Sequence, residues 1–249
     1  MRADTTPAGA RDLLAIWDDT RSRIVELLSA STDDVVDTAV PTVPGTTVHD
    51  VLAHLVGVAT RATKAPREAR LDTVALPAAG GATRGGTAQD LLLAWQHAAT
   101  AAAAHLATDP DLASLLITDA VMSEHDLRTA IDTPGARDSD AIRVALDELS
   151  GRFSDRVARA GLPPLRVTVE QWGTIAGAGH AISCVVADRF EFVRAMSGRR
   201  SAGEIGRWNW GVDPGVYLPV ISEVGVPAEE IHERDPRIPQ HMRDREFVL

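Results

Sequence analysis

The sequence predicts a mainly α-helical protein, in which a four-helix bundle with an extra helix is followed by a small α+β domain. Apolar residues recur at intervals of three and four in several long segments before Pro163. Pro163 and Pro164 then interrupt this pattern, and the next segment alternates apolar and polar residues as a β-strand does. With 249 residues, 45% of them hydrophobic, the chain is long enough for two domains, which we predict at 1–162 and 163–249.

The first two helices of the bundle are separated by a segment that cannot be helical. Leucines, Trp17 and Ile24 recur on one face of residues 11–30, which predicts an amphipathic helix there. Residues 40–46 contain two prolines and a glycine and end the helical pattern. Thr47 and Asp50 have the spacing of a capping box, with Asp in place of Glu, so the second helix is predicted over 48–61.

Three further helices complete the N-terminal part. A segment rich in Gly, Pro, Ala and Thr at 71–86 predicts a loop before them. Asp109 and Pro110 interrupt the helical pattern after the third helix, and residues 132–135 stop the fourth. The predicted helices cover residues 88–107, 114–131 and 139–160.

The C-terminal part combines β-favouring runs with short helices. Strands are predicted over 165–170 and 181–187, and helices over 189–196, 202–208 and 216–224. Cys184, the single cysteine, lies in the second of these strands and is predicted to be a buried, inert thiol. One cysteine excludes both an internal disulfide and a metal site built from several cysteines.

Charge and hydropathy narrow the classes of partner. The chain has 25 basic residues against 35 acidic ones, a net charge of −10, and Lys64 is its only lysine, which argues against a nucleic-acid-binding surface. No apolar run approaches the roughly 18 residues that a membrane span needs. We therefore expect a cytoplasmic protein, a monomer or homodimer, that acts on a small-molecule substrate.

Polar residues occupy helical positions that should face the bundle interior. His54 lies within an apolar run of the second helix, while Asp119, Ser123 and Asp126 share one face of the fourth. A buried carboxylate opposite a buried histidine is costly unless something neutralises it, and a divalent metal would do so. The alternatives are a core histidine satisfied by a hydrogen bond and a water-bridged polar layer.

Three segments together resemble one protein family. Residues 43–55 are similar to the first signature of the DinB-like, mycothiol-dependent maleylpyruvate isomerase family, and residues 119–130 with 134–138 resemble its second. Residues 190–201 are similar to the C-terminal domain of the same family. The three matches occur in the order of the family, which makes them more specific than any one alone.

The resemblance implies a metal-binding bundle and a C-terminal domain with the active site between them. In this family a histidine of the second helix and an acid-x-x-x-His pair of the fourth bind a divalent metal, usually zinc. The metal in turn binds a thiol cofactor, here mycothiol or a similar low-molecular-weight thiol. By position, His54 matches the first ligand and Asp119 the acid.

Two departures from the family pattern alter the implied site. Ser123 stands where the second histidine is expected, and a serine hydroxyl is a poor zinc ligand. His125 substitutes for it only if the helix is distorted, and Glu124 and Asp126 are other oxygen donors nearby. Thr46 replaces a tryptophan at the loop before the second helix. The predicted metal ligands are therefore His54, Asp119 and His125.

Arg199 is the predicted catalytic residue outside the bundle. It matches a C-terminal arginine that in this family holds an anionic substrate or thiol carboxylate, a role that suits a guanidinium. Alternatively, Gly198 caps a helix end and Arg199 complements its dipole. The resemblance thus predicts a small-molecule isomerase or thiol S-transferase with a partly degenerate metal site. The alternative is a metal-free member that binds a small molecule or a protein partner.

Overall fold

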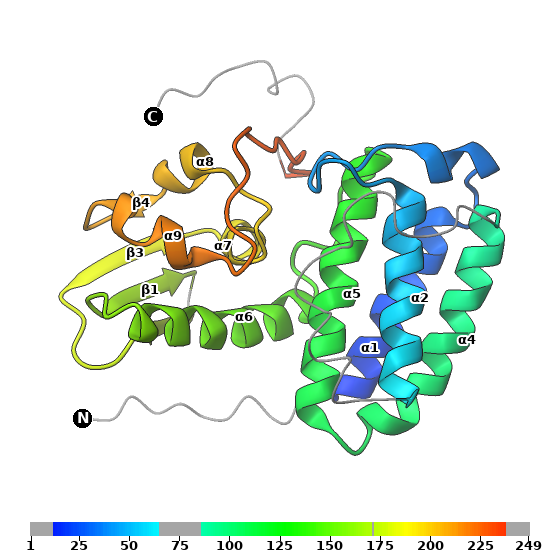
Figure 1. Cartoon of the computed structure of the whole chain (residues 1–249), viewed down its shortest axis with the longest axis horizontal. Helices are drawn as coiled ribbons and strands as arrows, with labels where there is room; N and C mark the ends of the chain where they lie inside the picture. Colours follow the sequence, from blue (N-terminus) through cyan, green and yellow to red (C-terminus); the bar gives the residue numbers. More distant parts are fainter. Residues whose placement is uncertain (1–11, 65–85, 171, 238–249) are drawn as a thin grey trace.

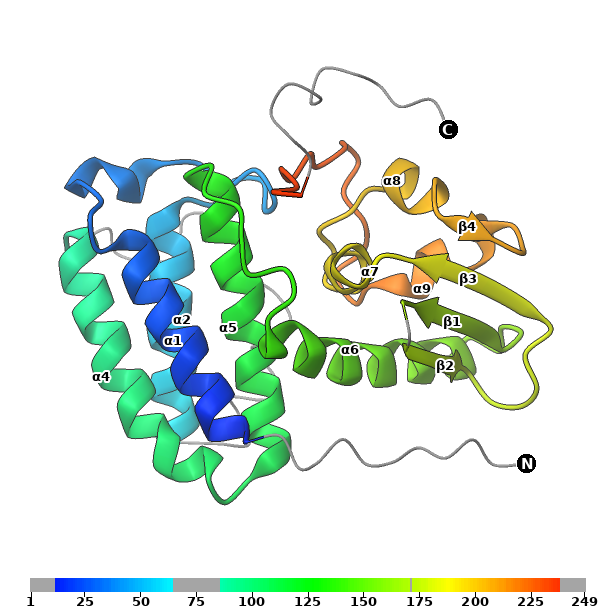
Figure 2. The same cartoon turned by 180° about the vertical axis from the view of Figure 1, so that it is seen from behind.

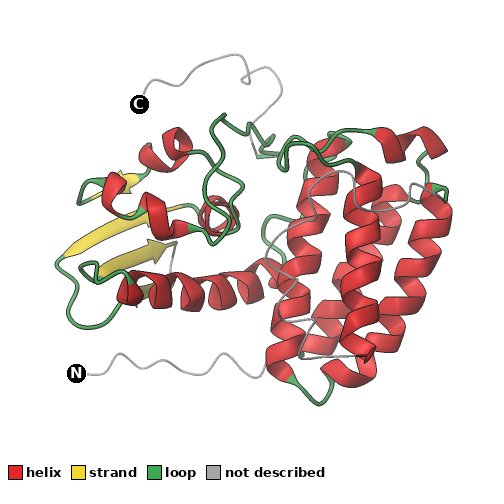
Figure 3. Ribbon diagram, in the orientation of Figure 1, coloured by secondary structure: helices red, strands yellow, loops and turns green. Residues whose placement is uncertain are grey.

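The computed structural model describes residues 12–64, 86–170 and 172–237. It confirms the predicted fold class: helices dominate the N-terminal part, and a small sheet lies in the C-terminal part (Figures 1 and 3). Most of the loop predicted over 71–86 lies outside the described residues. Four long helices stand side by side as a bundle, namely α1 (Leu13–Leu28), α2 (Val48–Lys64), α4 (Ala88–Leu106) and α5 (Pro110–Ala130).

Local side chains set where the bundle helices begin. The backbone N–H of Thr47 donates to Asp50 at 2.9 Å, and the backbone N–H of Asp50 donates to the Thr47 hydroxyl at 3.4 Å, so the predicted capping box forms. Helix α5 begins at Pro110 rather than near Ser114. The Asp109 carboxylate caps it, and proline is well suited to the first position of a helix.

The loop between α1 and α2 is ordered by its own hydrogen bonds. It contains a short helix, η1 (Asp33–Asp37), which the sequence pattern did not predict. Further on, the backbone N–H of Val40 donates to Thr46 at 3.0 Å, and the Thr46 hydroxyl donates to the Val43 carbonyl at 2.7 Å. These bonds fold residues 40–46 into a compact turn beside the start of α2.

Helix α6 (Asp140–Arg159) connects the two parts of the molecule. It runs across the direction of the bundle helices and lies along the small sheet (Figures 1 and 2). It contacts α5 at one end and packs against α7 (Arg189–Met196) and β2 (Trp172–Ala176) further along. The bundle and the C-terminal part therefore share this helix, and the boundary at 162 and 163 remains a prediction.

The C-terminal sheet has four strands in the order β2-β1-β3-β4. The central strands β1 (Leu165–Val169) and β3 (Ser183–Ala187) are parallel, while β2 and the two-residue β4 (Asn209–Trp210) pair antiparallel at the edges. Neither edge strand was predicted from the sequence, because one contains a glycine and the other is too short to alternate. Short helices complete this part, namely α8 (Ala202–Gly206), η2 (Pro214–Val216) and α9 (Leu218–Ile221), the last two replacing one helix predicted over 216–224.

The position of Cys184 corrects one prediction. Its side chain is exposed, whereas its neighbour Val185 is fully buried. Successive residues of a strand point to opposite faces, and the exposed Cys184 and Val186 share the face opposite the buried Val185. The thiol consequently lies on the open face of the sheet.

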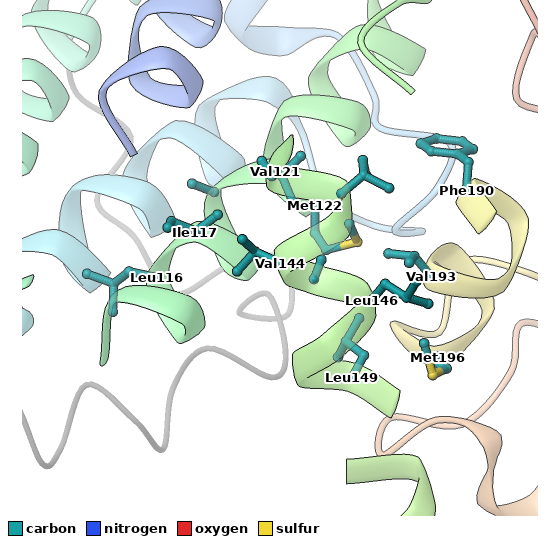
Figure 4. Close-up of a cluster of buried hydrophobic side chains, with 14 of the residues drawn as sticks. Leu116, Ile117, Val121, Met122, Val144, Leu146, Leu149, Phe190, Val193 and Met196 are labelled. Atoms are coloured by element: carbon teal, nitrogen blue, oxygen red, sulfur yellow. The ribbon is translucent and has the colours of Figure 1, made fainter. Parts of the chain in front are cut away.

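The two parts of the molecule are joined by a continuous apolar core. Figure 4 shows Met122 of α5, Leu149 of α6 and both Val193 and Met196 of α7 packed against one another. All four are at most 8% exposed. This packing fixes α7 and the turn that follows it against the middle of α5, where the polar residues of the bundle interior lie.

Candidate functional site

The centre of the candidate site is a direct contact between His54 of α2 and Asp119 of α5. His54 Nε2 lies 2.8 Å from Asp119 Oδ1, and the two residues are only 6% and 7% exposed. The predicted juxtaposition of these residues across the bundle is confirmed. Because each lies in the middle of a regular helix, the packing of α2 against α5 determines the distance between them.

The carboxylate changes the protonation chemistry of the imidazole. Burial alone would lower the pKa of His54, but the charge of Asp119 and the hydrogen bond to it outweigh burial. The pKa of His54 is therefore raised above its ordinary value of 6.5. The imidazole can therefore hold a proton at Nε2, facing the Asp119 carboxylate.

A small pocket opens beside this pair, where the bundle meets the C-terminal part. Its cavity volume is about 30 Å³, enough for roughly two water molecules. Ser123 lies on the pocket wall one helical turn beyond Asp119, and Met196 and Arg199 line the wall that the C-terminal part contributes. The pocket thus brings together the bundle pair and the predicted arginine.

Arg199 reaches the pocket because α7 ends in a tight turn. Gly198 has a φ of +77°, and the Arg199 backbone N–H donates to the Arg194 carbonyl at 2.8 Å, so the helix-capping role expected of Gly198 is present as well. The Arg199 side chain nevertheless turns inward and is 8% exposed. Its Nη2 donates to Asp126 Oδ2 at 2.9 Å, and its Nη1 donates to the Ser197 carbonyl at 2.5 Å.

Asp126 is a fully buried carboxylate that joins three parts of the chain. It accepts hydrogen bonds from Arg194 Nη2 at 2.7 Å, from Arg199, and from the Thr42 hydroxyl at 2.6 Å. Burial would raise the pKa of Asp126, but the two arginines and the Thr42 hydroxyl together lower it below its ordinary value. Asp126 therefore stays charged and holds Arg199 in place beside the pocket.

A second buried carboxylate extends this network into the C-terminal segment. Glu233 accepts from Arg194 at 2.5 Å and from Arg200 at 2.7 Å. Burial would raise the pKa of Glu233, but the charges of the two arginines hold it well below its ordinary range. Glu233 was not predicted from the sequence, because it is distant along the chain from both arginines and belongs to no recognisable motif.

A comparison with protein families shows what the helical bundle is similar to. Residues 17–128, from within α1 to near the end of α5, match the family model described as Mycothiol maleylpyruvate isomerase N-terminal domain. The helical bundle is thus similar to the N-terminal domain of this family. No curated protein and no solved structure matches the chain.

The bundle does not assemble the three predicted metal ligands. His125 does not line the pocket of the His54–Asp119 pair, and its ring packs against Phe190, with ring centroids 4.6 Å apart. Helix α5 is regular here, so a step of two residues rotates the side chain by about 200° from Ser123. Burial is the main cause, and the charge of Arg194 the second, that lowers the pKa of His125 well below 6.5. The ring is therefore neutral.

The other oxygen donors near Ser123 are also engaged. Glu124 is fully buried and is held by Arg23 at 2.9 Å and by Arg128 at 2.8 Å, while Asp126 is held by the arginines described above. Within the described parts of the chain, no group of three His, Cys, Asp or Glu side chains could hold a metal ion. A catalytic zinc site takes three protein ligands, so His54, Asp119 and a serine hydroxyl do not fit one.

The positive charges around the His54–Asp119 pair also disfavour a bound metal ion. The charges of Arg61 and Arg199 each act to lower the pKa of His54, because they disfavour a further positive charge on its ring. A dication at this position would meet the same repulsion. The arrangement instead suits a proton on the imidazole and an anion beside Arg199.

No helix in the described residues has the length and apolar character that crossing a membrane requires. The N-terminal helices are amphipathic, with their apolar faces in the shared core.

Proposed function

We propose that this chain is a small-molecule isomerase or thiol S-transferase of the mycothiol-dependent maleylpyruvate isomerase type. The observation that carries the proposal is the meeting of the His54–Asp119 pair and Arg199 in one pocket, within a bundle of that family. A low-molecular-weight thiol, mycothiol in this family, would supply the nucleophile that adds to an unsaturated carbon of the substrate.

The chain's own residues have distinct tasks in such a reaction. Arg199 binds a carboxylate of the substrate or of the thiol through guanidinium N–H groups, since its charge is buried beside the pocket. His54 carries a proton at Nε2, and Asp119 orients the ring and stabilises its protonated form. A protonated imidazole also favours the thiolate over the thiol.

The two reactions differ only in the last step. When the thiolate adds, the carbon–carbon double bond becomes a single bond that can rotate. Expulsion of the same thiolate then restores the double bond in the other geometry, with no net change in the thiol. If the carbon is instead protonated, the thioether is the product. We assign no step to a metal, because the residues present do not fit one.

Activity measurements test the proposal directly. Purified protein is incubated with mycothiol and maleylpyruvate, and the isomerisation is followed by absorbance; a reactive unsaturated acid serves for thioether formation. We expect thiol-dependent turnover that a chelator leaves unchanged. His54→Ala and Arg199→Ala should each reduce turnover at least tenfold, whereas His97→Gln, at an exposed position of α4, should not. Turnover that needs no thiol, or that survives both substitutions, would contradict the proposal.

Ser123 favours a second candidate function. Without the third family ligand, the pocket retains groups that recognise an anion but lacks the metal that activates a thiol. The chain would then be a small-molecule-binding module. Saturable binding of a carboxylate that depends on Arg199, with no turnover in any thiol assay, is the result that distinguishes this candidate.

A further inference from the structure

A larger cavity adjoins the His54 pocket, and the function proposed above leaves its role unassigned. It lies between residues 41–44, which precede α2, and residues 224–231, which follow α9, two segments that lie side by side in Figures 1 and 2. Its volume is about 410 Å³. Pockets for small organic ligands commonly measure about 300–1,000 Å³, so the space suits a molecule larger than a short dicarboxylic acid.

The walls of this cavity are mainly apolar. Proline and valine side chains line both sides, with Pro41 and Val43 from one segment and Val226, Pro227 and Ile231 from the other. A ligand that filled the space would cover these side chains and remove them from water, which favours an apolar ligand body.

Both walls are held in place by hydrogen bonds. On one side, the Thr42 hydroxyl is anchored to the buried Asp126 at 2.6 Å. On the other, the backbone N–H of Ile231 donates to Glu204 Oε2 at 3.0 Å, and Glu233 is bound by the buried arginines. The cavity is therefore a formed feature of the fold, and a ligand need not order either wall on binding.

Arg199 gives the cavity a charged end. Together with Ser197 and Val224, it lines both this cavity and the His54 pocket, so the two spaces adjoin at Arg199. The Nε atom of Arg199 is buried and has no acceptor among the described residues. A buried donor without a partner is costly, and an incoming carboxylate can supply the acceptor.

We propose that the cavity binds the body of an amphipathic monocarboxylate, whose carboxylate lies at Arg199 and whose hydrocarbon part lies between residues 41–44 and 226–231. This inference rests on the proposed function, whose substrate class it names. Glu229 and Glu230 line the same cavity and are exposed. Glu230 is paired with Arg207, whereas the charge of Glu229 would repel a second carboxylate placed beside it, so the part of the ligand within this cavity carries no further negative charge.

Calorimetric titration of the full chain with octanoate tests the inference. We expect saturable binding of octanoate and binding of octanamide, which lacks the charge, to be at least tenfold weaker. Maleate, which is small and doubly charged, should bind more weakly than octanoate. Absence of saturable octanoate binding, equal binding of octanamide, or tighter binding of maleate would each overturn the inference.

Charged substitutions locate the binding site. Val226→Asp places a carboxylate in the cavity and should weaken octanoate binding at least tenfold. The matched control is Val186→Asp, at a 42% exposed position on the sheet that is not part of the cavity. Circular dichroism checks that both variants are folded; should Val226→Asp fail to fold, Val43→Asp replaces it. Unchanged binding in the folded cavity variant would place octanoate elsewhere and refute the assignment.

The outcomes separate this inference from the function on which it rests. If the chain turns over only small polar acids with a thiol, the proposed function stands and the substrate class named here is wrong. If octanoate binds as expected but no thiol-dependent turnover of any unsaturated acid is found, the cavity assignment stands and the proposed reaction fails.

Discussion

Replacing Asp126 by Asn should destabilise the protein far more than loss of an ordinary charged residue. The Asp126 side chain is 0% exposed and neutralises Arg194 and Arg199 at 2.7 and 2.9 Å. Asparagine has nearly the same shape, but it carries no charge, and its NH2 group replaces one of the two oxygens that accept from Arg194 and Arg199. Removing one partner of a buried ion pair costs about 3–5 kcal/mol of unfolding free energy.

Thermal and urea unfolding measure this loss. For a protein of this size, each kcal/mol lowers the Tm by about 2–4 °C, so we expect Asp126→Asn to lower it by roughly 6–20 °C. The control is Asp132→Asn, which removes an ion pair to Arg234 in which Asp132 is 74% exposed and should cost less than about 1 kcal/mol.

A double-mutant cycle separates the ion pair from packing. In an Arg199→Met background, one of the two charges that Asp126 neutralises is gone, so Asp126→Asn should cost less than it does in the wild type. If Asp126→Asn is no more destabilising than Asp132→Asn, or if its cost is the same in both backgrounds, the buried charges do not stabilise the junction as argued here.

Three further results are expected. Ser123→His should bind zinc more tightly than the wild type in a chelator competition, because it restores an imidazole one turn from Asp119; equal affinities would show that position 123 does not face the site. Gly198→Ala should lower the unfolding free energy by about 1–3 kcal/mol, since a Cβ at φ +77° would lie 2.5 Å from Val224 Cγ2; urea midpoints unchanged from wild type would contradict this. The free energy of unfolding should be maximal near pH 6.5. Above this pH, folded His54 keeps a proton that the unfolded chain releases, because its pKa is raised, so stability falls as the pH rises. Below this pH, His125 gains a proton in the unfolded chain that the buried ring excludes, so stability falls as the pH falls. Each slope is at most about 1.4 kcal/mol per pH unit, and each should vanish in His54→Gln or His125→Leu respectively.

The elements that the sequence predicted well are those with a local physical cause. The amphipathic pattern of α1, the capping box at Thr47 and Asp50, and the alternation of β1 each follow from neighbours along the chain. Edge strand β4 depends instead on pairing with β3, a contact between distant residues. Its two residues carry no signal of their own.

The same distinction between local and long-range causes explains which residues of the candidate site were predicted from the sequence. His54 and Asp119 were found because each interrupts an apolar helical face, and a polar residue there implies a partner. The buried pairing of Arg194 with Glu233 was missed, because a charged residue in a sequence normally indicates a solvated surface. His125 was placed near the metal position by sequence proximity alone, and the rotation of a regular helix carries it to another face.

The contact between His54 and Asp119 also explains how this bundle accommodates Ser123. A buried imidazole and carboxylate that share a metal need a third strong ligand to complete the site. Without that ligand, the two groups satisfy each other across 2.8 Å, and the proton on the imidazole supplies the positive charge that the carboxylate requires. Arg199 can then approach the same pocket because Asp126 balances its charge from the opposite side. On the function proposed here, stabilisation of a substrate or thiol anion thus depends on an arginine and a protonated histidine, and it should weaken as pH rises through the pKa of His54.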